Sequence, residues 1–277
     1  MRKIRFATWN LNNRKRTDKH ALFLRKINPD VIAFQETSRN FHQQLLSEKL
    51  FRWGHISTAP PLNTRRSPRA LHCSIAGNLP AQILDTYSLM ELPFPERSLC
   101  VKAAIDNHEI QFCSFHVPPG ASWKQLKPQS MCTIDQYLRT QTTTTLVGID
   151  ANSPKLDHLL WENNTWWWPE EPLLLGHNRQ HPLNDALRLY LDQFPHELQR
   201  IKAGYPNGPL ATTYIRGNGK LKTPCRYDHI YISPHIRVTA IDHVYEEAVA
   251  AESDHALVIA ELEIPSAYHD AIVKSNS

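Results

Sequence analysis

The sequence predicts an α/β (α+β) protein in which two sheets pack face to face. Short runs typical of strands recur along the chain with short connections, and stretches with helical spacing of apolar residues lie between some of them. The chain has 277 residues, enough for one large core, and it contains no flexible linker, low-complexity tract or internal repeat. We therefore expect one domain over residues 1–265, followed by a surface tail at 266–277.

Each expected element has a local sequence signal. Alternation over 4–9 predicts a strand, and the continuous apolar run over 31–34 predicts a strand that is covered on both faces. Further strands are expected at 71–77, 82–87, 98–105, 109–116, 144–149, 211–215, 226–233, 236–246 and 251–262. Helices are expected at 17–27, 38–50, 123–140 and 182–191. The last of them carries Asp185 and Arg188, a plausible internal ion pair.

Composition limits the class of protein. The net charge of +4, with 15 His besides, is mildly basic and permits an anionic substrate without requiring one. There is no apolar run of about 18 residues, and the basic N-terminus lacks the apolar core of a signal peptide. The five cysteines are irregularly spaced with no CxxC pair, which favours reduced, buried thiols. We expect a soluble, cytoplasmic monomer.

Polar residues follow the first two buried strands. Glu36 stands at the end of the 31–34 run, where a carboxylate is costly unless it is paired or bound to a cation. Asn10 ends the first strand, where its amide could orient an acidic ligand or touch phosphate. An ordinary Asn-rich turn is the alternative for Asn10.

The middle of the chain offers further candidates. His116 ends a strand before a Pro-Pro-Gly turn, which would hold the imidazole at the rim of a cleft, although such a histidine is more often structural. Asp150 and Asn152 follow another buried strand. Their spacing puts both on one side, where one can bind metal or carry a proton and the other can hydrogen-bond an oxyanion. Arg97 opens a strand and is either a phosphate ligand or an ordinary surface arginine.

The last two strands complete the set of candidates. Asp228 begins the 226–233 strand among apolar neighbours and needs a partner, for which a histidine is the obvious choice. Ser253, Asp254 and His255 precede the C-terminal apolar run. Asp254 offers a hard carboxylate, and His255 titrates near neutrality, which together suit a metal ion and a general base.

Taken together, these residues give the chain a resemblance to the endonuclease/exonuclease/phosphatase superfamily, the DNase I-like enzymes. Six blocks occur in the order that this family shows and span residues 4–262. The blocks are Thr8-Trp9-Asn10, Phe34-Gln35-Glu36-Thr37, Ser114-Phe115-His116, Gly148-Ile149-Asp150-Ala151-Asn152, Tyr227-Asp228-His229-Ile230 and Ser253-Asp254-His255. The resemblance implies a four-layer αββα sandwich of two mostly antiparallel sheets flanked by helices.

The resemblance also implies metal-dependent hydrolysis of phosphoesters. It assigns Glu36 as the main Mg²⁺ ligand, with Asn10 beside it and Asp254 completing the metal side; Mn²⁺ is a substitute. It assigns His255 as the general base and Asp228 as the residue that orients it.

The phosphate side follows from the same comparison. Asp150 is implied as a second acid/base or metal-side group, and Asn152 and His116 as phosphate contacts. This chain has Gly-Ile-Asp-Ala-Asn where the family often has Gly-Asp-Phe-Asn, but Asp150 and Asn152 keep their spacing. Residues 70–78 offer no clear counterpart of the glutamate that pairs with the first histidine in the DNase I branch, which favours phosphate binding over proton donation by His116.

The substrate stays open among three classes. A nuclease acting on DNA or RNA is favoured by the mild basicity, by the basic groups at 14–16 and at Arg65, Arg66 and Arg69, and by the tryptophans at 166–168. The three indoles either stack nucleobases or pack against a helix, and packing is the commoner case. The alternatives are a small or lipid phosphate, such as an inositol phosphate, and an inactive binding module.

Overall fold

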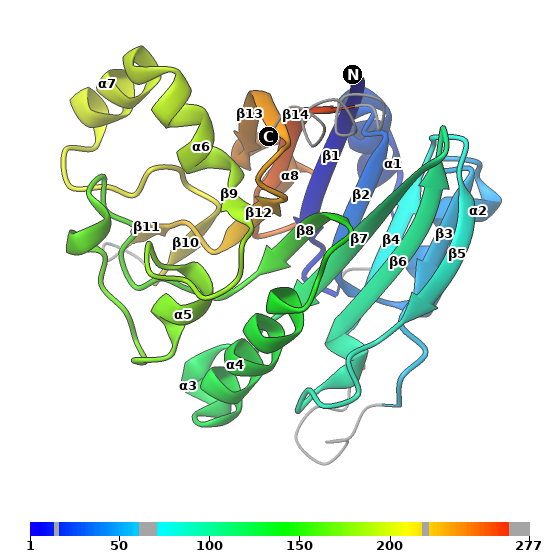
Figure 1. Cartoon of the computed structure of the whole chain (residues 1–277), viewed down its shortest axis with the longest axis horizontal. Helices are drawn as coiled ribbons and strands as arrows, with labels where there is room; N and C mark the ends of the chain where they lie inside the picture. Colours follow the sequence, from blue (N-terminus) through cyan, green and yellow to red (C-terminus); the bar gives the residue numbers. More distant parts are fainter. Residues whose placement is uncertain (14–16, 61–70, 218–221, 266–277) are drawn as a thin grey trace, which may run out of the picture.

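Two six-stranded sheets packed against each other form the centre of the molecule (Figure 1). The structure is a computed structural model, and it describes residues 1–13, 17–60, 71–217 and 222–265. The basic groups expected to contact nucleic acid at 14–16 and 65–69, and the tail expected at 266–277, lie outside the described residues.

The first sheet holds the N-terminal and C-terminal strands side by side. Its strands are β1 (Arg2–Asn10), β2 (Val31–Thr37), β3 (Trp53–Ile56), β4 (His72–Gly77), β13 (Arg237–Val244) and β14 (Leu257–Ile264). They lie in the order β13–β14–β1–β2–β4–β3. Only the pair of β1 and β2 is parallel in this sheet as described, and the other neighbours are antiparallel.

The second sheet is built on the same plan from the middle of the chain. Its strands are β5 (Gln82–Tyr87), β6 (Ser98–Ile105), β7 (His108–His116), β8 (Thr144–Asp150), β9 (Asn184–Asp185) and β12 (Asp228–Ile232). They lie in the order β5–β6–β7–β8–β12–β9, and β7 and β8 run parallel. A separate ribbon pairs β10 (Tyr214–Arg216) with β11 (Thr223–Cys225).

The main core fills the space between the two sheets. Ile4 and Val31 from the first sheet pack there with Phe112 and Leu146 from the second, and all four are at most 1% exposed. Gly148 allows the sheets to approach, because a Cβ at this position would lie 2.6 Å from the Thr8 side chain.

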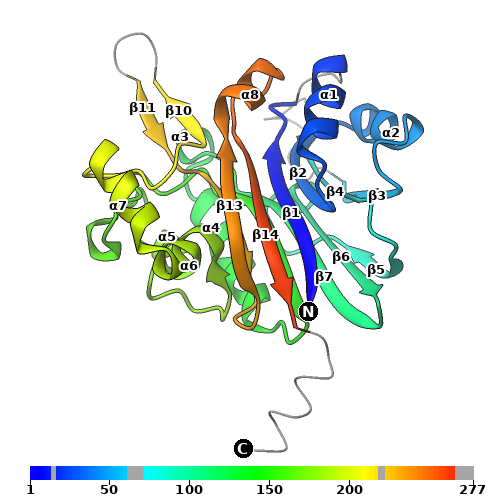
Figure 2. The same ribbon diagram turned by 90° about the horizontal axis from the view of Figure 1, so that it is seen from above.

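Helices cover the outer faces of both sheets. They are α1 (Asp18–Ile27), α2 (Arg39–Ser47), α3 (Gly120–Trp123), α4 (Leu126–Arg139), α5 (Glu171–Leu175), α6 (Ala186–Gln193), α7 (Pro195–Gly204) and α8 (Tyr245–Ala250). Phe23 of α1 and Phe41 of α2 pack on the first sheet, beside β1 and β2 (Figure 2). Ile134 of α4 and Leu174 of α5 pack on the second. The predicted four-layer αββα sandwich is therefore confirmed.

Several expected elements differ in their limits. The strand expected over 236–246 ends at Val244, because residues 245–250 form helix α8. The helix expected over 182–191 begins at Ala186, since the Asp185 side chain accepts the backbone N–H groups of Leu187 and Arg188 as an N-cap. The expected ion pair of Asp185 with the Arg188 side chain is wrong: the Arg188 guanidinium pairs with Asp157 instead.

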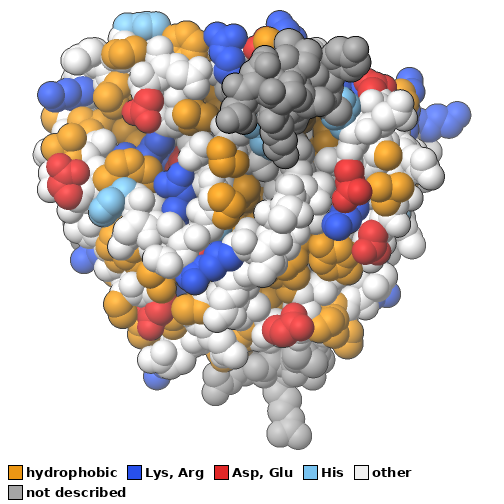
Figure 3. Space-filling model, viewed as in Figure 1, with side chains coloured by type: hydrophobic (Ala, Val, Ile, Leu, Met, Phe, Trp, Pro, Cys, Tyr) orange, Lys and Arg blue, Asp and Glu red, His pale blue; other side chains and the backbone are white. Residues whose placement is uncertain are grey.

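Other expectations concern the chain as a whole. All five cysteines are free thiols, as predicted, and four of them are buried. No helix within the described ranges is long and apolar enough to span a membrane. On the face seen in Figure 3, the basic and acidic side chains of the described residues are interspersed, in keeping with a net charge of only +4.

Candidate active site

The topology brings the polar strand ends to one edge of the two sheets. Strands β1, β2, β7 and β8 end at this edge, whereas β6, β12 and β14 run antiparallel to a neighbour and begin there. The pairing register places both Asp228 and His116 beside Asp150. Eight of the nine predicted site residues flank strand ends at this edge, and Arg97 directly precedes β6 there. The nine are Asn10, Glu36, Arg97, His116, Asp150, Asn152, Asp228, Asp254 and His255.

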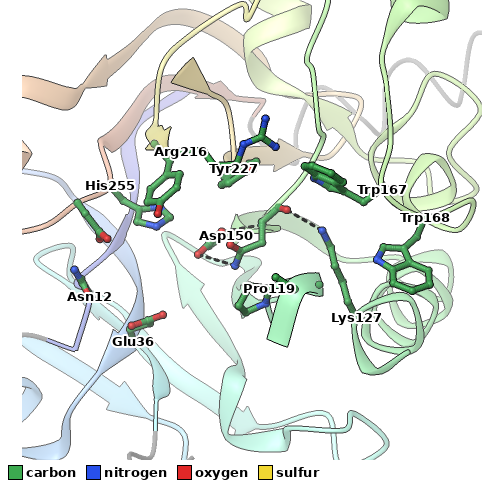
Figure 4. A pocket seen from close by; sticks show the side chains of 15 residues that line it. Asn12, Glu36, Pro119, Lys127, Asp150, Trp167, Trp168, Arg216, Tyr227 and His255 are labelled. Carbon is green, nitrogen blue, oxygen red and sulfur yellow. Dashed lines mark hydrogen bonds between the residues drawn. The ribbon is translucent and has the colours of Figure 1, made fainter. Parts of the chain in front are cut away.

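A cavity of about 610 Å³ opens at this edge. Five of the predicted site residues line this cavity: Glu36, Asp150, Asn152, Asp254 and His255. Figure 4 shows Glu36 and His255 on one side of the cavity and Lys127, Trp167 and Trp168 on the opposite side. The cavity therefore has an acidic end and an aromatic end.

A β-bulge directs Glu36 towards the cavity. The register of β2 against β4 shifts between Phe34 and Thr37, and Glu36 has a φ of 53°, a left-handed conformation that is uncommon for a residue with a side chain. Such backbone strain costs on the order of 1–3 kcal/mol and concentrates at functional sites. Burial raises the pKa of Glu36, and the positive charge of Arg97 opposes that rise.

His255 is held by one contact of its ring and one of its backbone. Its Nδ1 lies 2.8 Å from Oδ2 of Asp228, which is fully buried. Its backbone N–H donates to Ser253 Oγ at 3.0 Å, and that hydroxyl donates to the carbonyl of Asn10 at 2.6 Å. Ser253 thus connects the start of β14 to the end of β1 through these two hydrogen bonds.

The carboxylates around His255 favour its protonated form. Burial lowers the pKa of His255, but Asp228 and Asp150 outweigh that effect and raise it to about 10. Burial raises the pKa of Asp150 to about 7, with Asp228 adding to the rise and His255 opposing it. Without further positive charge, His255 and Asp150 therefore titrate as a coupled pair and retain protons near neutral pH.

Two asparagine amides bracket Asp150. Asn10 Nδ2 donates to Asp150 Oδ2 at 2.7 Å, and the backbone N–H of Asn152 donates to Oδ1 at 2.9 Å. Asn10 Oδ1 accepts the backbone N–H of Asn12 at 2.8 Å. This bond orients the Asn10 amide, which in turn orients Asp150. The Asn152 amide donates to the Val117 carbonyl at 2.9 Å. Direct contacts of Asn10 with metal and of Asn152 with phosphate stay predictions.

His116 and Arg97 lie behind Glu36. His116 Nε2 is 3.5 Å from Glu36 Oε1 and 3.7 Å from Asp150 Oδ2, and neither ring nitrogen has a hydrogen-bond partner among the described residues. Burial, together with the charges of Arg97 and His255, holds the pKa of His116 well below its usual value. The imidazole is therefore neutral, which disfavours proton donation to phosphate.

Arg97 occupies a different place from the one expected. It is 3% exposed, its guanidinium lies 4.8 Å from the Phe94 ring centroid, and it is not among the described residues that line the cavity. The alternative of a surface arginine does not fit this burial, and contact of Arg97 with phosphate stays a prediction. The geometry instead lets Arg97 offset the charge of Glu36 from behind.

The residues present fit a divalent cation. Asp150, Asp228 and His255 can bring ligand atoms within 4.8 Å of one another, but the His255–Asp228 hydrogen bond already uses one atom of each. Asp228 Oδ1 has no partner among the described residues, and Glu36 and Asp254 add two more carboxylates to the cavity. Asp150 and Asp228 are fully buried, and buried carboxylates are costly unless positive charge offsets them; oxygen ligands suit Mg²⁺.

Some residues of the cavity wall were not predicted. Lys127, Tyr214, Arg216 and Tyr227 line the cavity, and Lys127 contacts Glu171 beneath its surface. Lys127 lies in the expected helical stretch at 123–140, which contains a proline. Only the neighbouring strand signals at 211–215 and 226–233 pointed to the position of the two tyrosines.

Comparison with known proteins adds evidence on the fold. No protein-family model matches the sequence, and neither does any curated protein. Among solved structures, D. rerio TDP2 complexed with a single-strand DNA product superposes with a TM-score of 0.68 at 12% identity, covering 95% of this chain and 99% of that one. An endonuclease/exonuclease/phosphatase from Bacteroides vulgatus gives a TM-score of 0.63 at 14% identity, covering 96% and 100%.

A third structure agrees with these two. The human Nocturnin catalytic domain with bound sulfate gives a TM-score of 0.61 at 16% identity, covering 95% of both chains. At such low identities the likeness establishes the fold and nothing finer. The chain therefore has the fold of the endonuclease/exonuclease/phosphatase superfamily, as its six sequence blocks predict.

Proposed function

We propose that this protein is a metal-dependent phosphodiesterase of the nuclease type. One observation carries the proposal: Glu36, Asp150, Asp254 and a hydrogen-bonded pair of His255 with Asp228 converge at one end of a single cavity. Carboxylates in excess of cationic groups suit a bound Mg²⁺ or Mn²⁺, and a carboxylate-oriented histidine suits a general base. The free, buried thiols are consistent with a reducing compartment such as the cytoplasm.

In this mechanism, His255 is the group that moves a proton. Its Nδ1–H donates to Asp228, which leaves Nε2 to accept the proton of the water that attacks phosphorus. Asp228 stabilises the imidazolium that forms, and Asp150, which is buried at the same end of the cavity, is the acid that can supply the proton to the leaving oxygen.

Glu36 and Asp254 would hold the metal, with Asn10 orienting the neighbouring acids. When bound, the cation neutralises phosphate charge and polarises a phosphoryl oxygen. Positive charge at this end of the cavity also disfavours the imidazolium, so the pKa of His255 falls towards the range that a general base needs.

A nucleic-acid substrate is supported by two points. The solved TDP2 structure that this fold resembles holds a single-strand DNA product, and the Nocturnin domain holds a sulfate anion. The cavity in this chain also places aromatic and basic side chains opposite its acidic end. A small phosphomonoester substrate is the alternative that the test below separates.

The test is a substrate panel with Mg²⁺, Mn²⁺ and EDTA. It contains single-stranded and duplex DNA, RNA, and a set of phosphomonoesters that release inorganic phosphate. We expect hydrolysis of oligonucleotides with either metal and none in EDTA. His255→Ala and Glu36→Gln should each lower turnover at least about a hundredfold, since each removes a principal catalytic contribution.

A matched control uses Glu91→Gln, a change of the same kind at an exposed position, which should keep full turnover. Release of phosphate from monoesters alone would replace the nuclease proposal with a phosphatase. Unchanged turnover in His255→Ala or Glu36→Gln would refute the assignment of these residues.

A further inference from the structure

The three consecutive tryptophans at 166–168 do not share one environment. Trp166 is half-buried and packs on the core outside the second sheet, and Trp168 is half-buried with Nε1 close to Gly120. Trp167 and Trp168 both line the cavity, but of the three indoles only Trp167 is exposed, at 45%. An indole left open to water in a cavity forgoes a large gain from burial, so its position calls for a ligand that covers it.

The structure fixes Trp167 relative to the catalytic end of the cavity. The backbone N–H of Trp167 donates to Glu171 Oε2 at 2.9 Å, and Glu171 Oε1 lies 2.8 Å from Lys127 Nζ. Lys127 Nζ donates in turn to the backbone carbonyl of Asn152 at 2.7 Å. Both side chains of the ion pair are at most 1% exposed, so a buried connection sets the distance between the indole and the Asp150–Asn152 loop.

Two cationic side chains lie over the Trp167 ring. Lys155 Nζ lies 5.1 Å from the ring centroid, and the Arg216 guanidinium carbon lies 4.9 Å from it. Neither cation has a carboxylate partner among the residues that the structure describes, and Arg216 Nη1 has no hydrogen-bond partner there. Figure 4 shows Arg216 and Trp167 on neighbouring parts of the cavity wall. No carboxylate among the described residues neutralises these two charges, and the Nη1 atom of Arg216 is itself buried.

The two ends of the cavity together match a nucleotide. The acidic end suits a metal-bound scissile phosphate, and an indole with an adjoining guanidinium offers planar surfaces on which a base can stack. The unpaired cations suit the next phosphate of the same strand. A paired base has both faces covered by its neighbours, so the wall favours an unpaired base.

We propose that Trp167, with Lys155 and Arg216, forms a subsite for the unpaired nucleobase and flanking phosphate of the nucleotide next to the scissile bond. This inference rests on the proposed phosphodiesterase function and names its substrate class, a single-stranded or frayed nucleic-acid end. Tyr214 and Tyr227 form a second stacked pair, with centroids 5.5 Å apart. The Tyr214 ring also lies 4.9 Å from the ring of His255, so replacing Tyr214 would disturb the proposed general base. Trp167 is therefore the better position to test.

The experiment measures equilibrium binding, which does not depend on turnover. Fluorescence anisotropy of an end-labelled single-stranded oligonucleotide is compared with that of an abasic chain of equal length, in EDTA to prevent metal-dependent cleavage. We expect Trp167→Ala to weaken binding of the base-bearing chain about tenfold, and binding of the abasic chain less than about twofold. Trp167→Phe should retain most of the affinity, because it keeps an aromatic face.

The control is Tyr205→Ala, which removes an exposed aromatic ring that is not among the described residues lining this cavity. It should leave both affinities unchanged. If Trp167→Ala lowers the melting temperature, the binding of the two oligonucleotides is measured with Trp167→Leu instead, because leucine keeps apolar bulk without a ring.

The outcomes separate the two proposals. Equal losses on both chains, no loss on either, or no preference of the wild type for the base-bearing chain would overturn the subsite. A wild type that binds through Trp167 but cleaves no phosphodiester with Mg²⁺ or Mn²⁺ would sustain the subsite and refute the nuclease.

Discussion

Two clusters of buried charge adjoin strand β12, and they differ in how their charges are matched. The first lies just before the strand and joins two arginines to two aspartates. Arg226 pairs with Asp185 at 2.6 Å and with Asp157 at 3.1 Å, and Arg188 pairs with the other oxygen of Asp157. Each carboxylate has a guanidinium partner, so this cluster is electrically balanced.

The second cluster begins two residues later, at Asp228. There, Asp228, Asp150 and Glu36 surround one imidazole, that of His255, with Arg97 behind. Negative charge exceeds positive charge, and Asp228 Oδ1 and both nitrogens of His116 have no hydrogen-bond partner among the described residues. The first cluster also leaves the Nε atoms of Arg188 and Arg226 without a hydrogen-bond partner among the described residues, so the two clusters differ in net charge rather than in unmatched atoms.

The contrast teaches which buried charges to assign to structure. The balanced cluster contributes to the fold because removing one member leaves a buried charge without a partner. The unbalanced cluster contains the left-handed Glu36 and carboxylates that repel one another, and a bound cation would reduce that repulsion. Breaking the balanced cluster should therefore lower the stability of the protein, whereas adding a cation at the unbalanced cluster should raise it.

The largest expected effect comes from breaking the balanced cluster. Asp185→Ala removes a bidentate partner of Arg226 and the N-cap of α6, and it should lower the free energy of unfolding by about 3–5 kcal/mol. The melting temperature should fall by about 10 °C. Asp192→Ala, on the exposed face of the same helix, should change the free energy by less than about 0.5 kcal/mol. Equal melting temperatures for the two variants would show that the Arg226 cluster is dispensable for stability.

Sequence reasoning located the unbalanced cluster better than the balanced one. Glu36, Asp150, Asp228 and His255 flank apolar strands, and strand ends that share an edge bring such residues together. In the balanced cluster, the partner of Arg188 is Asp157, 31 residues away on a loop, and no local pattern encodes that contact. The sequence suggested the nearer Asp185, which caps the helix instead.

The aromatic wall shows the same limit. Alternation and helical spacing report which residues are apolar, but they do not report which of three adjacent indoles line a cavity. The backbone N–H of Trp167 donates to Glu171, which pairs in turn with Lys127 from a different helix. Long-range contacts of this kind determine the aromatic wall, whereas the acidic end of the cavity follows from strand order.

The second prediction uses pH to separate the clusters in the metal-free protein. The pKa of His255 is raised to about 10 in the folded state, so its contribution to stability is complete below about pH 6.5 and is lost as pH rises through 10. Burial alone would raise the pKa of Asp185, but Arg226 holds it well below the usual value. The contribution of Asp185 is therefore present above about pH 4 and is lost as pH falls through its folded pKa.

Thermal denaturation in EDTA from pH 3 to pH 10 would check both slopes. Between pH 7 and 10 the wild type should lose on the order of 5 °C of melting temperature that His255→Gln does not lose. Below about pH 4, Asp185→Asn should lose less stability than the wild type. A wild type and a His255→Gln variant with the same alkaline slope would contradict the raised pKa of His255.

The smallest expected effect is the stabilisation by metal, and it bears most directly on the comparison. A cation that binds only the folded state at ten times its Kd adds about 1.4 kcal/mol, or about 3 °C in melting temperature. Glu36→Gln should abolish this increment, because it removes a carboxylate of the unbalanced cluster. Asp185→Ala should show the same metal-dependent rise in melting temperature, starting from a lower value without metal. The carboxylates of the balanced cluster are already paired with arginines and do not bind the cation. Scanning calorimetry with Mg²⁺ and with EDTA measures both. An equal increment in Glu36→Gln would move the metal to the group of Asp150, Asp228 and His255, whose ligand atoms lie within 4.8 Å of one another, and would leave Glu36 as a substrate-side acid.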